Sequence, residues 1–250
     1  MSMLGSPCWY EIATPDQAAT QAFYGPLLGW TFQDAGMAGF SYGLAMAGGD
    51  MVAGLMQPDA PMPCFWMIYF AADDIDATAR RVSDLGGKVF RAPEDIPGTG
   101  RFAILIDPQG APFGLLQPLE GQKGNAFDQA KQGHGNWNEL NSTDPVAALA
   151  FYRDLFGWQA STAMPMGETG DYQLFAHQGR DIGAMMPLQK PGTPSHWLPY
   201  FGVPSATATI AKTTELGGTI HYGPSEVPGG AFIAMGQDPQ GAAFAVVGGK

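Results

Sequence analysis

The chain contains the same sequence pattern twice, and this repeat constrains its fold more than any other feature. The matching segments are 9–12 (WYEI) with 137–140 (WNEL), 23–30 (FYGPLLGW) with 151–158 (FYRDLFGW), and 107–110 (DPQG) with 238–241 (DPQG). The first two pairs are shifted by 128 residues and the third by 131. Because an internal repeat fixes the architecture, each half is expected to build the same structure, and the two copies can be compared position by position.

Each copy reads as two consecutive β-α-β-β-β modules. In the first module a short strand precedes Thr14-Pro15-Asp16, which is a helix-start signal, and Gly29 follows an apolar helical pattern. Pro61-Met62-Pro63 then interrupts the chain, and the same order begins again. We therefore predict an α+β fold of four βαβββ modules. They pair into two domains, each a curled mixed sheet that forms an open cup with helices outside.

The predicted domain boundaries follow the repeat. The first domain covers residues 1–120, with modules at about 7–58 and 62–118. A polar stretch rich in Gly, Gln, Lys and Asn at 121–133 reads as a linker. The second domain covers 134–250, with modules at about 134–187 and 194–248. A chain of 250 residues has room for two domains of ordinary size.

Composition excludes several classes of partner. The net charge is −11 with only 12 Lys and Arg, which argues against nucleic acid and against an anionic membrane surface. Apolar runs fall short of the roughly 18 residues that span a bilayer. The N-terminal residues lack the basic and apolar regions of a signal peptide. We therefore predict a cytoplasmic protein with no nucleic-acid or membrane partner.

The repeated motifs resemble those of the vicinal oxygen chelate superfamily. Each copy has a first strand, the FY…GW helix, a Leu-Gly-Gly helix end and a DPQG turn before its last strand. That superfamily includes glyoxalase I, bleomycin and fosfomycin resistance proteins, and extradiol dioxygenases. The chain is most similar to its single-chain, two-domain glyoxalase-like members. The resemblance implies a cup that often holds a divalent metal, which acts as a Lewis acid or redox centre.

The resemblance also implies four metal-ligand positions in each domain, usually occupied by His or Glu. In this chain the matching positions hold residues whose side chains are poor ligands for such metals. Spacing places them at Trp9 and Gly114 in the first copy and at Trp137 and Ala245 in the second. The remaining positions lie near Gly54 and Met67, and near Gly183 and Leu198. The sequence therefore predicts no cofactor, and it disfavours a divalent metal without excluding one.

Glu11 and Glu139 are the candidate catalytic residues. Side chains alternate along a strand, so each glutamate shares a face with the Trp two residues earlier. A carboxylate in an apolar cup can act as a base or hold a cation or hydroxyl, and it can also be purely structural. Candidate ligand-binding residues are the aromatic, apolar and His side chains expected on the cup face: Trp9, Trp137, Met67, Tyr69, His196, Leu198 and Tyr200.

These features favour a protein that binds a small, largely apolar organic molecule without the usual metal. One alternative is an enzyme of glyoxalase, hydroxylase or dioxygenase type that uses Glu11 or Glu139 as an acid or base, or an unconventional metal site. A second alternative is a resistance protein that sequesters an antibiotic. The sequence leaves open the ligand, the use of one cup or both, and whether the chain is a monomer or a homodimer.

Overall fold

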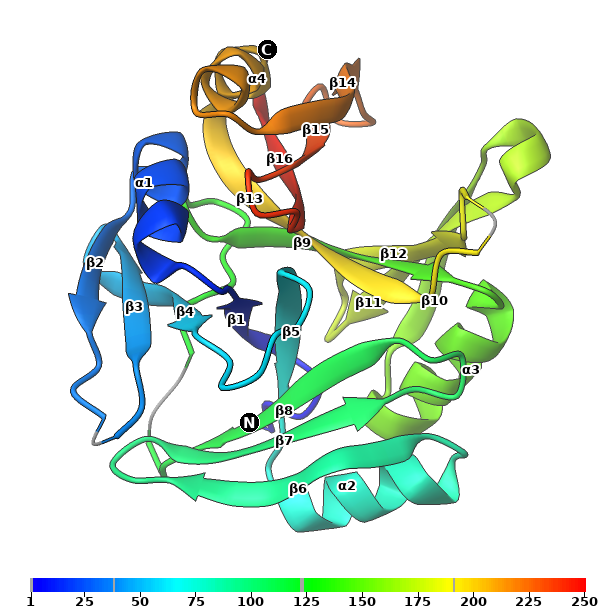
Figure 1. The fold of residues 1–250 in the computed structure, drawn as a ribbon. Coiled ribbons are helices and arrows are strands. Elements are labelled where there is room, and N and C mark those ends of the chain that lie inside the picture. The colour runs from blue at the N-terminus through cyan, green and yellow to red at the C-terminus, as the bar shows by residue number, and fades with distance from the viewer. Residues whose placement is uncertain (1, 38, 122–123, 191) are drawn as a thin grey trace. The chain divides into compact units, whose positions relative to one another are not determined.

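The computed structural model describes residues 2–37, 39–121, 124–190 and 192–250. These residues form two eight-stranded mixed sheets that are not closed into barrels (Figure 1). The first half of the chain supplies β1 (Pro7–Ala13), α1 (Gln17–Leu28), β2 (Thr31–Asp34), β3 (Tyr42–Ala47), β4 (Asp50–Met56), β5 (Phe65–Ala71), α2 (Ile75–Asp84), β6 (Lys88–Ile96), β7 (Gly100–Ile106) and β8 (Pro112–Pro118).

The second half repeats this order. Its elements are β9 (Gly135–Ser142), α3 (Pro145–Phe156), β10 (Gln159–Pro165), the short 3-10 helix η1 (Gly167–Thr169), β11 (Asp171–His177), β12 (Arg180–Pro187), β13 (His196–Ser205), α4 (Ala206–Glu215), β14 (Thr219–Glu226), β15 (Phe232–Gln237) and β16 (Ala243–Gly249). The strand orders are β2-β3-β4-β1-β5-β8-β7-β6 and β10-β11-β12-β9-β13-β16-β15-β14. The predicted α+β class with four βαβββ modules is confirmed.

Parallel pairs lie next to the middle of each sheet, and antiparallel pairs lie toward its edges. β1 runs parallel to β4 with Glu11 opposite Gly54, and β9 runs parallel to β12 with Glu139 opposite Ala184. The counterpart of Gly54 in the second copy is therefore Ala184. The sequence placed this position near Gly183, which is the residue before Ala184 on β12.

The four α-helices of the described residues begin with the same kind of cap. The side chain of Asp16, Asp74, Asp144 or Ser205 accepts a hydrogen bond from the backbone N–H three residues later. Such a cap satisfies one of the unpaired donors at the helix start. α1 and α3 end at Gly29 and Gly157, which adopt positive φ values of 71° and 76° that glycine tolerates best. The helix boundaries thus follow from local sequence.

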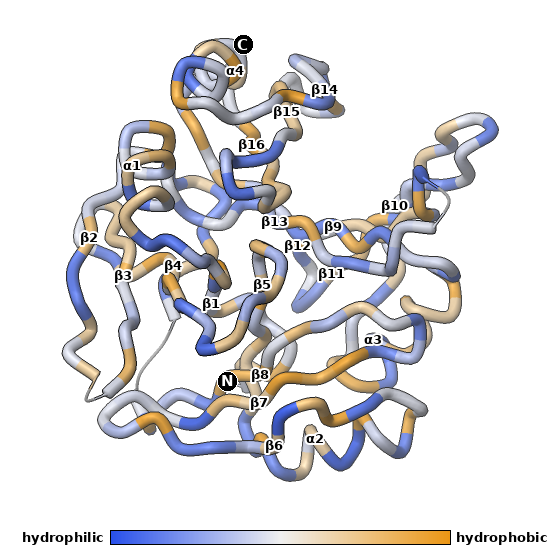
Figure 2. Tube along the Cα trace, in the orientation of Figure 1, coloured by the Kyte–Doolittle hydropathy of each residue, from blue (hydrophilic) through white to orange (hydrophobic). Residues whose placement is uncertain are grey.

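The chain packs into two compact units, and each draws segments from both halves. The first unit comprises Met1–Cys8, Ile68–Gly124 and Trp137–Trp197, and the second comprises Trp9–Met67, Asn125–Asn136 and Leu198–Lys250. Within the first unit the edge strand β6 is largely exposed and mixes charged and apolar residues, whereas β7 and β8 carry buried apolar residues. Figure 2 shows the hydropathy along these strands. Each unit thus mixes modules from both copies, and the predicted domain boundaries remain a prediction.

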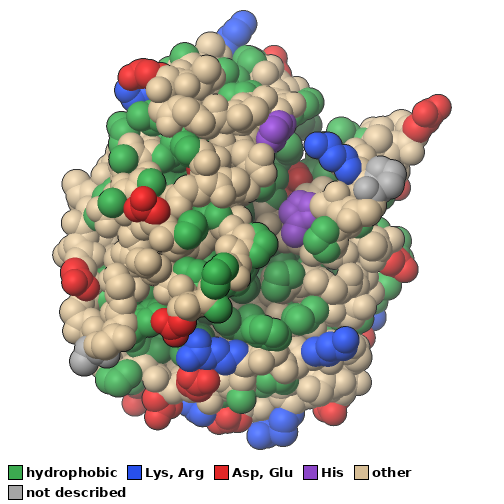
Figure 3. All heavy atoms as spheres, viewed as in Figure 1, with side chains coloured by type: hydrophobic (Ala, Val, Ile, Leu, Met, Phe, Trp, Pro, Cys, Tyr) green, Lys and Arg blue, Asp and Glu red, His purple; other side chains and the backbone are tan. Residues whose placement is uncertain are grey.

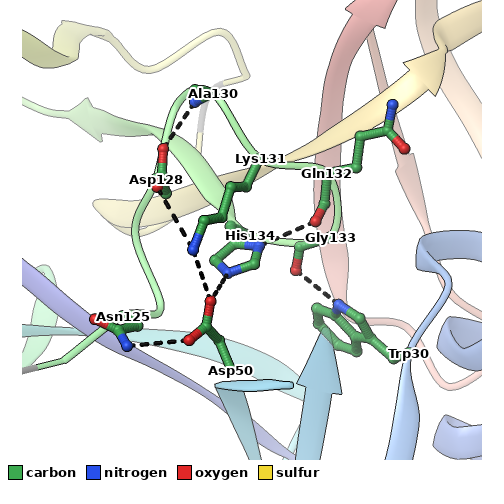
Figure 4. Close-up of polar contacts among 9 residues, drawn as sticks. All are labelled: Trp30, Asp50, Asn125, Asp128, Ala130, Lys131, Gln132, Gly133 and His134. Atoms are coloured by element: carbon green, nitrogen blue, oxygen red, sulfur yellow. Dashed lines mark hydrogen bonds and ion pairs between the residues drawn. The ribbon is translucent and has the colours of Figure 1, made fainter. Parts of the chain in front are cut away.

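The predicted linker contributes residues to the second unit. Asp50 accepts hydrogen bonds from Lys131 Nζ at 2.7 Å and Asn125 Nδ2 at 3.0 Å, and its carboxylate lies 3.2 Å from His134 Nε2 (Figure 4). Trp30 donates its indole N–H to the Gly133 carbonyl at 2.7 Å. His134 is only 2% exposed, so this side chain is buried. Residues 122 and 123 of the linker lie outside the described residues.

The surface carries scattered charge. On the face drawn in Figure 3, Lys and Arg side chains lie in small separate groups among polar and apolar surface. In the described part of the chain, no helix combines the length and the apolar character needed to cross a membrane.

Candidate functional site

A hydrogen-bonded chain of three side chains lies on one face of the first-copy strands. The indole N–H of Trp9 donates to the hydroxyl of Tyr42 at 3.1 Å, and this hydroxyl donates to Glu11 Oε2 at 2.6 Å. Trp9 and Glu11 are partly exposed on β1, whereas Tyr10 and Ile12 between and beyond them are buried. We call this arrangement of Trp, Tyr and Glu a sheet-face relay.

The second copy contains the same relay. Trp137 Nε1 donates to the Tyr172 hydroxyl at 2.9 Å, which donates to Glu139 Oε2 at 3.0 Å. Asn141 adds a further bond here, because its Nδ2 donates to Glu139 Oε1 at 2.9 Å. Glu139 is 2% exposed. The sequence placed each Trp and its Glu on one face of a strand. In both copies the two side chains share a tyrosine as hydrogen-bond partner.

The tyrosine of each relay was missed in the sequence. Tyr42 and Tyr172 lie on β3 and β11, two strands away from the Trp and Glu that they join. A signal was present, since the two tyrosines recur with a shift of 130 residues. Their role depends on which strands are neighbours, and local sequence does not specify that.

The residues at the family's metal-ligand positions do not fit a metal centre of that kind. Gly54 has no side chain, and a Cβ added there would overlap the hydroxyl of Tyr42. Gly114 is covered by the ring of Tyr69 in the same way. Among the described residues, no three His, Cys, Asp or Glu side chains are grouped so that they could hold a metal ion. At Gly54 and Gly114, tyrosine rings thus take the space that a side chain would need.

The other predicted ligand-binding residues divide by burial. Met67, Tyr69, Leu198 and Tyr200 are all less than 7% exposed. His196 is partly exposed, and its Nδ1 lies 2.9 Å from the carbonyl of Pro194. Among the predicted residues, the Trp–Glu pairs are joined in relays within one unit. Whether any of these residues binds a ligand remains a prediction.

A second kind of relay lies in the core and explains the repeated motifs. In the second unit Trp66 donates to the Tyr24 hydroxyl at 2.9 Å, which donates to Asp238 at 3.2 Å. In the first unit Trp197, Tyr152 and Asp107 make the same two bonds, both at 3.2 Å. We call these the buried relays. They join the FY motif of one copy to the DPQG turn of the other.

Asp107 and Asp238 therefore do more than form turns. Asp107 Oδ1 also accepts the backbone N–H groups of Gln109 and Ala111, and Asp238 does the same with Gln240 and Ala242. Burial raises the pKa of both carboxyls, and the donated hydrogen bonds oppose this effect. The aspartates thus close the turn and anchor a helix tyrosine.

The electrostatics of the first sheet-face relay keep its tyrosine protonated. Burial raises the pKa of Tyr42 well above its usual value, and the neighbouring charge of Glu11 raises it further. At neutral pH the phenol is therefore a hydrogen-bond donor to the carboxylate. This bond is short, as expected for a hydroxyl that donates to an ionised oxygen. The result is a fixed carboxylate beside an indole ring, an arrangement suited to a cation or a hydroxyl donor on an aromatic molecule.

The comparisons with known proteins show the family. A glyoxalase-like domain model matches residues 9–116, and a model of the glyoxalase/bleomycin resistance protein/dioxygenase superfamily matches residues 134–246. A Mycobacterium bovis protein named "Putative glyoxylase CFP32" is 36% identical over 249 residues, covering 97% of this chain and 94% of that protein. The chain belongs to the glyoxalase/bleomycin resistance protein/dioxygenase superfamily, as its motifs predicted.

The chain is also similar to a biosynthesis protein and to two solved structures. The anthracycline biosynthesis protein DnrV of Streptomyces peucetius is 33% identical, covering 97% of this chain and 93% of that protein. Among solved structures, the Mn(II)-bound glyoxalase from Novosphingobium aromaticivorans matches with a TM-score of 0.69 at 20% identity, over 99% of this chain and 83% of that one. The 2,3-dioxygenase LapB from Pseudomonas sp. KL28 also has a TM-score of 0.69, at 14% identity over 99% and 94%. These two structures are similar in fold.

Proposed function

We propose that the protein binds a small, largely apolar organic molecule at a sheet-face relay, without a metal ion. The observation that carries this proposal is that each copy holds a Trp, a Tyr and a Glu in one hydrogen-bonded chain beside the positions where the family places its metal ligands. In this proposal the carboxylate and the hydroxyl take over the orienting role of the metal.

The composition of the relay supports a flat ligand. An indole ring offers a broad apolar surface at little cost in conformational entropy, and its N–H is held by the tyrosine so that the ring has one orientation. Small-molecule sites commonly combine such apolar surface with a few fixed polar groups. The name of the relative DnrV, an anthracycline biosynthesis protein, supports the same chemical class, because anthracyclines are planar aromatic molecules with hydroxyl and amino groups.

Two measurements test this proposal. The protein is purified without added metal, and its metal content is measured by inductively coupled plasma mass spectrometry. Binding of doxorubicin, a planar anthracycline, is then followed by tryptophan fluorescence with and without EDTA. We expect no stoichiometric transition metal and an affinity that EDTA leaves unchanged. A stoichiometric metal whose removal abolishes binding would overturn the proposal, as would an absence of binding.

A catalytic role for Glu11 is the second candidate. The short bond between Glu11 and Tyr42 holds a proton acceptor and a proton donor side by side, which is the arrangement needed to move a proton on a bound substrate. The names of the relatives, which include a glyoxylase, favour testing it. In this reading Glu11 takes a proton from the substrate and the Tyr42 hydroxyl stabilises the negative charge that forms.

Replacement of both glutamates separates the two candidates. Glu11→Gln and Glu139→Gln keep the shape of the carboxyl group and remove the base. An enzyme would lose turnover of methylglyoxal with glutathione, or of a catechol, by about 100-fold or more, in line with the usual contribution of a general base. If wild-type protein shows no turnover of these substrates, the catalytic candidate loses its support.

A further inference from the structure

Trp9 and Trp137 are the tryptophans that solvent reaches. Both are partly exposed, on β1 and β9, whereas the other four tryptophans of the chain are at most 5% exposed. Indole rings are electron-rich, and a one-electron oxidant dissolved in water reacts with an exposed ring before a buried one. Trp9 and Trp137 are therefore the tryptophans that such an oxidant meets first.

Each of these rings begins a chain of hydrogen bonds that ends at a carboxylate. Trp9 Nε1 lies 3.1 Å from the Tyr42 hydroxyl, which lies 2.6 Å from Glu11 Oε2. In the second copy the corresponding distances are 2.9 Å and 3.0 Å. At these separations a proton can pass directly from the phenol to the carboxylate. The tyrosine of each relay thus contacts both the exposed indole and a proton acceptor.

In such a relay the proton of the tyrosine has to leave together with an electron. Burial raises the pKa of Tyr42 well above its usual value, and the charge of Glu11 raises it further, so the phenol keeps its proton at neutral pH. Loss of an electron alone would leave a positive charge on a buried ring, which is costly. Transfer of the proton to Glu11 neutralises both groups. The hydrogen bond therefore makes Tyr42 easier to oxidise.

We propose that each sheet-face relay is a site of one-electron oxidation, at which a small inorganic radical is reduced and the relay tyrosine becomes the radical. The oxidant first takes an electron from the indole of Trp9 or Trp137. The tyrosine then returns an electron to the indole, and its hydroxyl proton passes to the glutamate. The oxidant has gained one electron, the tryptophan is restored, and a neutral phenoxyl radical remains beside a protonated carboxyl. This activity does not depend on the proposed ligand binding.

The buried relays provide an internal comparison. Trp66, Tyr24 and Asp238 are joined by the same two hydrogen bonds, but Trp66 is only 5% exposed. A radical in water therefore meets the sheet-face relays first. Exposure of the indole, rather than the identity of the three groups, selects the sites of oxidation.

Pulse radiolysis with the azide radical, which is reduced to azide, tests the proposal on the full chain. The reference protein carries Tyr222→Phe, because Tyr222 is 48% exposed and can react directly. We expect the indolyl radical absorbance to form first and then to decay while the phenoxyl absorbance grows. The growth should be first-order, independent of protein concentration, and slower in D₂O because a proton moves. A reference protein that shows no growth of the phenoxyl radical overturns the proposal.

Variants of the reference protein identify the groups involved. Tyr42→Phe with Tyr172→Phe should abolish the phenoxyl growth and prolong the indolyl radical, and unchanged growth in this variant overturns the proposal.

Glu11→Gln with Glu139→Gln should slow the growth at least about tenfold, since an amide is a poor proton acceptor. An unchanged rate excludes the glutamates as acceptors and overturns the proposal. The matched control is Tyr24→Phe in a buried relay, which should leave the growth as it is, and loss of the growth in this control contradicts the choice of the sheet-face relays. Circular dichroism confirms that each variant is folded before irradiation.

Discussion

The sheet-face relays and the buried relays use the same chemistry in different surroundings. In both, an indole N–H donates to a phenol, and the phenol donates to a carboxylate. The buried relays connect a helix to a turn, and their tyrosines, Tyr24 and Tyr152, are fully buried. The first sheet-face relay lies on strands and keeps its Trp and Glu partly exposed. The residue types alone thus do not distinguish a structural relay from a candidate binding relay. The exposure of the Trp and carboxylate side chains to solvent does distinguish them.

The largest expected effect is loss of a buried carboxylate. Asp107→Ala removes the acceptor for the Tyr152 hydroxyl and for two backbone N–H groups, and we expect the free energy of unfolding to fall by ~3 kcal/mol. The measurement is urea denaturation. Glu11→Ala is the matched change in the sheet-face relay and should cost ~1 kcal/mol or less, because Glu11 and Trp9 are partly exposed to water. Equal losses would contradict the comparison.

Removal of the tyrosine hydroxyl should also destabilise a buried relay more than a sheet-face relay, but the difference in unfolding free energy should be smaller. Tyr152→Phe leaves the Trp197 indole and Asp107 without this partner in the core, at an expected cost of ~2 kcal/mol. Tyr42→Phe acts where the neighbouring Trp and Glu are partly exposed and should cost ~1 kcal/mol. Both substitutions keep the ring, so the slopes of the urea transitions should not change. If Tyr42→Phe is the more destabilising variant, the distinction by burial is wrong.

The pH dependence of the buried relay has a defined sign. Burial raises the folded-state pKa of Asp107 above its unfolded value, so the folded state holds this proton more tightly. Stability contributed by Asp107 therefore falls as the pH rises from the unfolded pKa, about 3.9, through the raised folded value. The wild type should lose stability relative to Asp107→Asn over this range and then level off. A constant difference between the two proteins would show that the pKa is not raised.

The smallest expected effect has the opposite sign and concerns Asp50. Hydrogen bonds from Lys131 and His134 lower its pKa from 3.8 to about 2. Its contribution to stability is therefore present above about pH 4 and is lost as the pH falls toward 2. Thermal unfolding of the wild type and Asp50→Asn should differ at pH 6 and converge near pH 2. A difference that persists at pH 2 would exclude this ionisation as its cause.

Much of the fold was predictable because its signals are local. The repeated segments fix four modules, Asp16 and Gly29 mark the ends of a helix, and alternation places Trp9 and Glu11 on one face. The missing parts depend on contacts between distant residues. Tyr42 reaches Glu11 across the strand pairing, and the buried His134 contacts Asp50, which lies 84 residues earlier in the chain. The partnership of Tyr24 with Asp238 likewise needs the packing of two copies.

Each compact unit contains segments of both sequence copies, which relates the chain to a dimer of half-length chains. Tyr24 of the first copy meets Asp238 of the second, and Tyr152 of the second meets Asp107 of the first. Two identical half-length chains would form the same two contacts by exchange between partners in a symmetric dimer. A covalent connection keeps such partners together at a high effective concentration even when the protein is dilute. Once joined, the two copies can carry different residues at matching positions, as they do at Ala13 and Asn141.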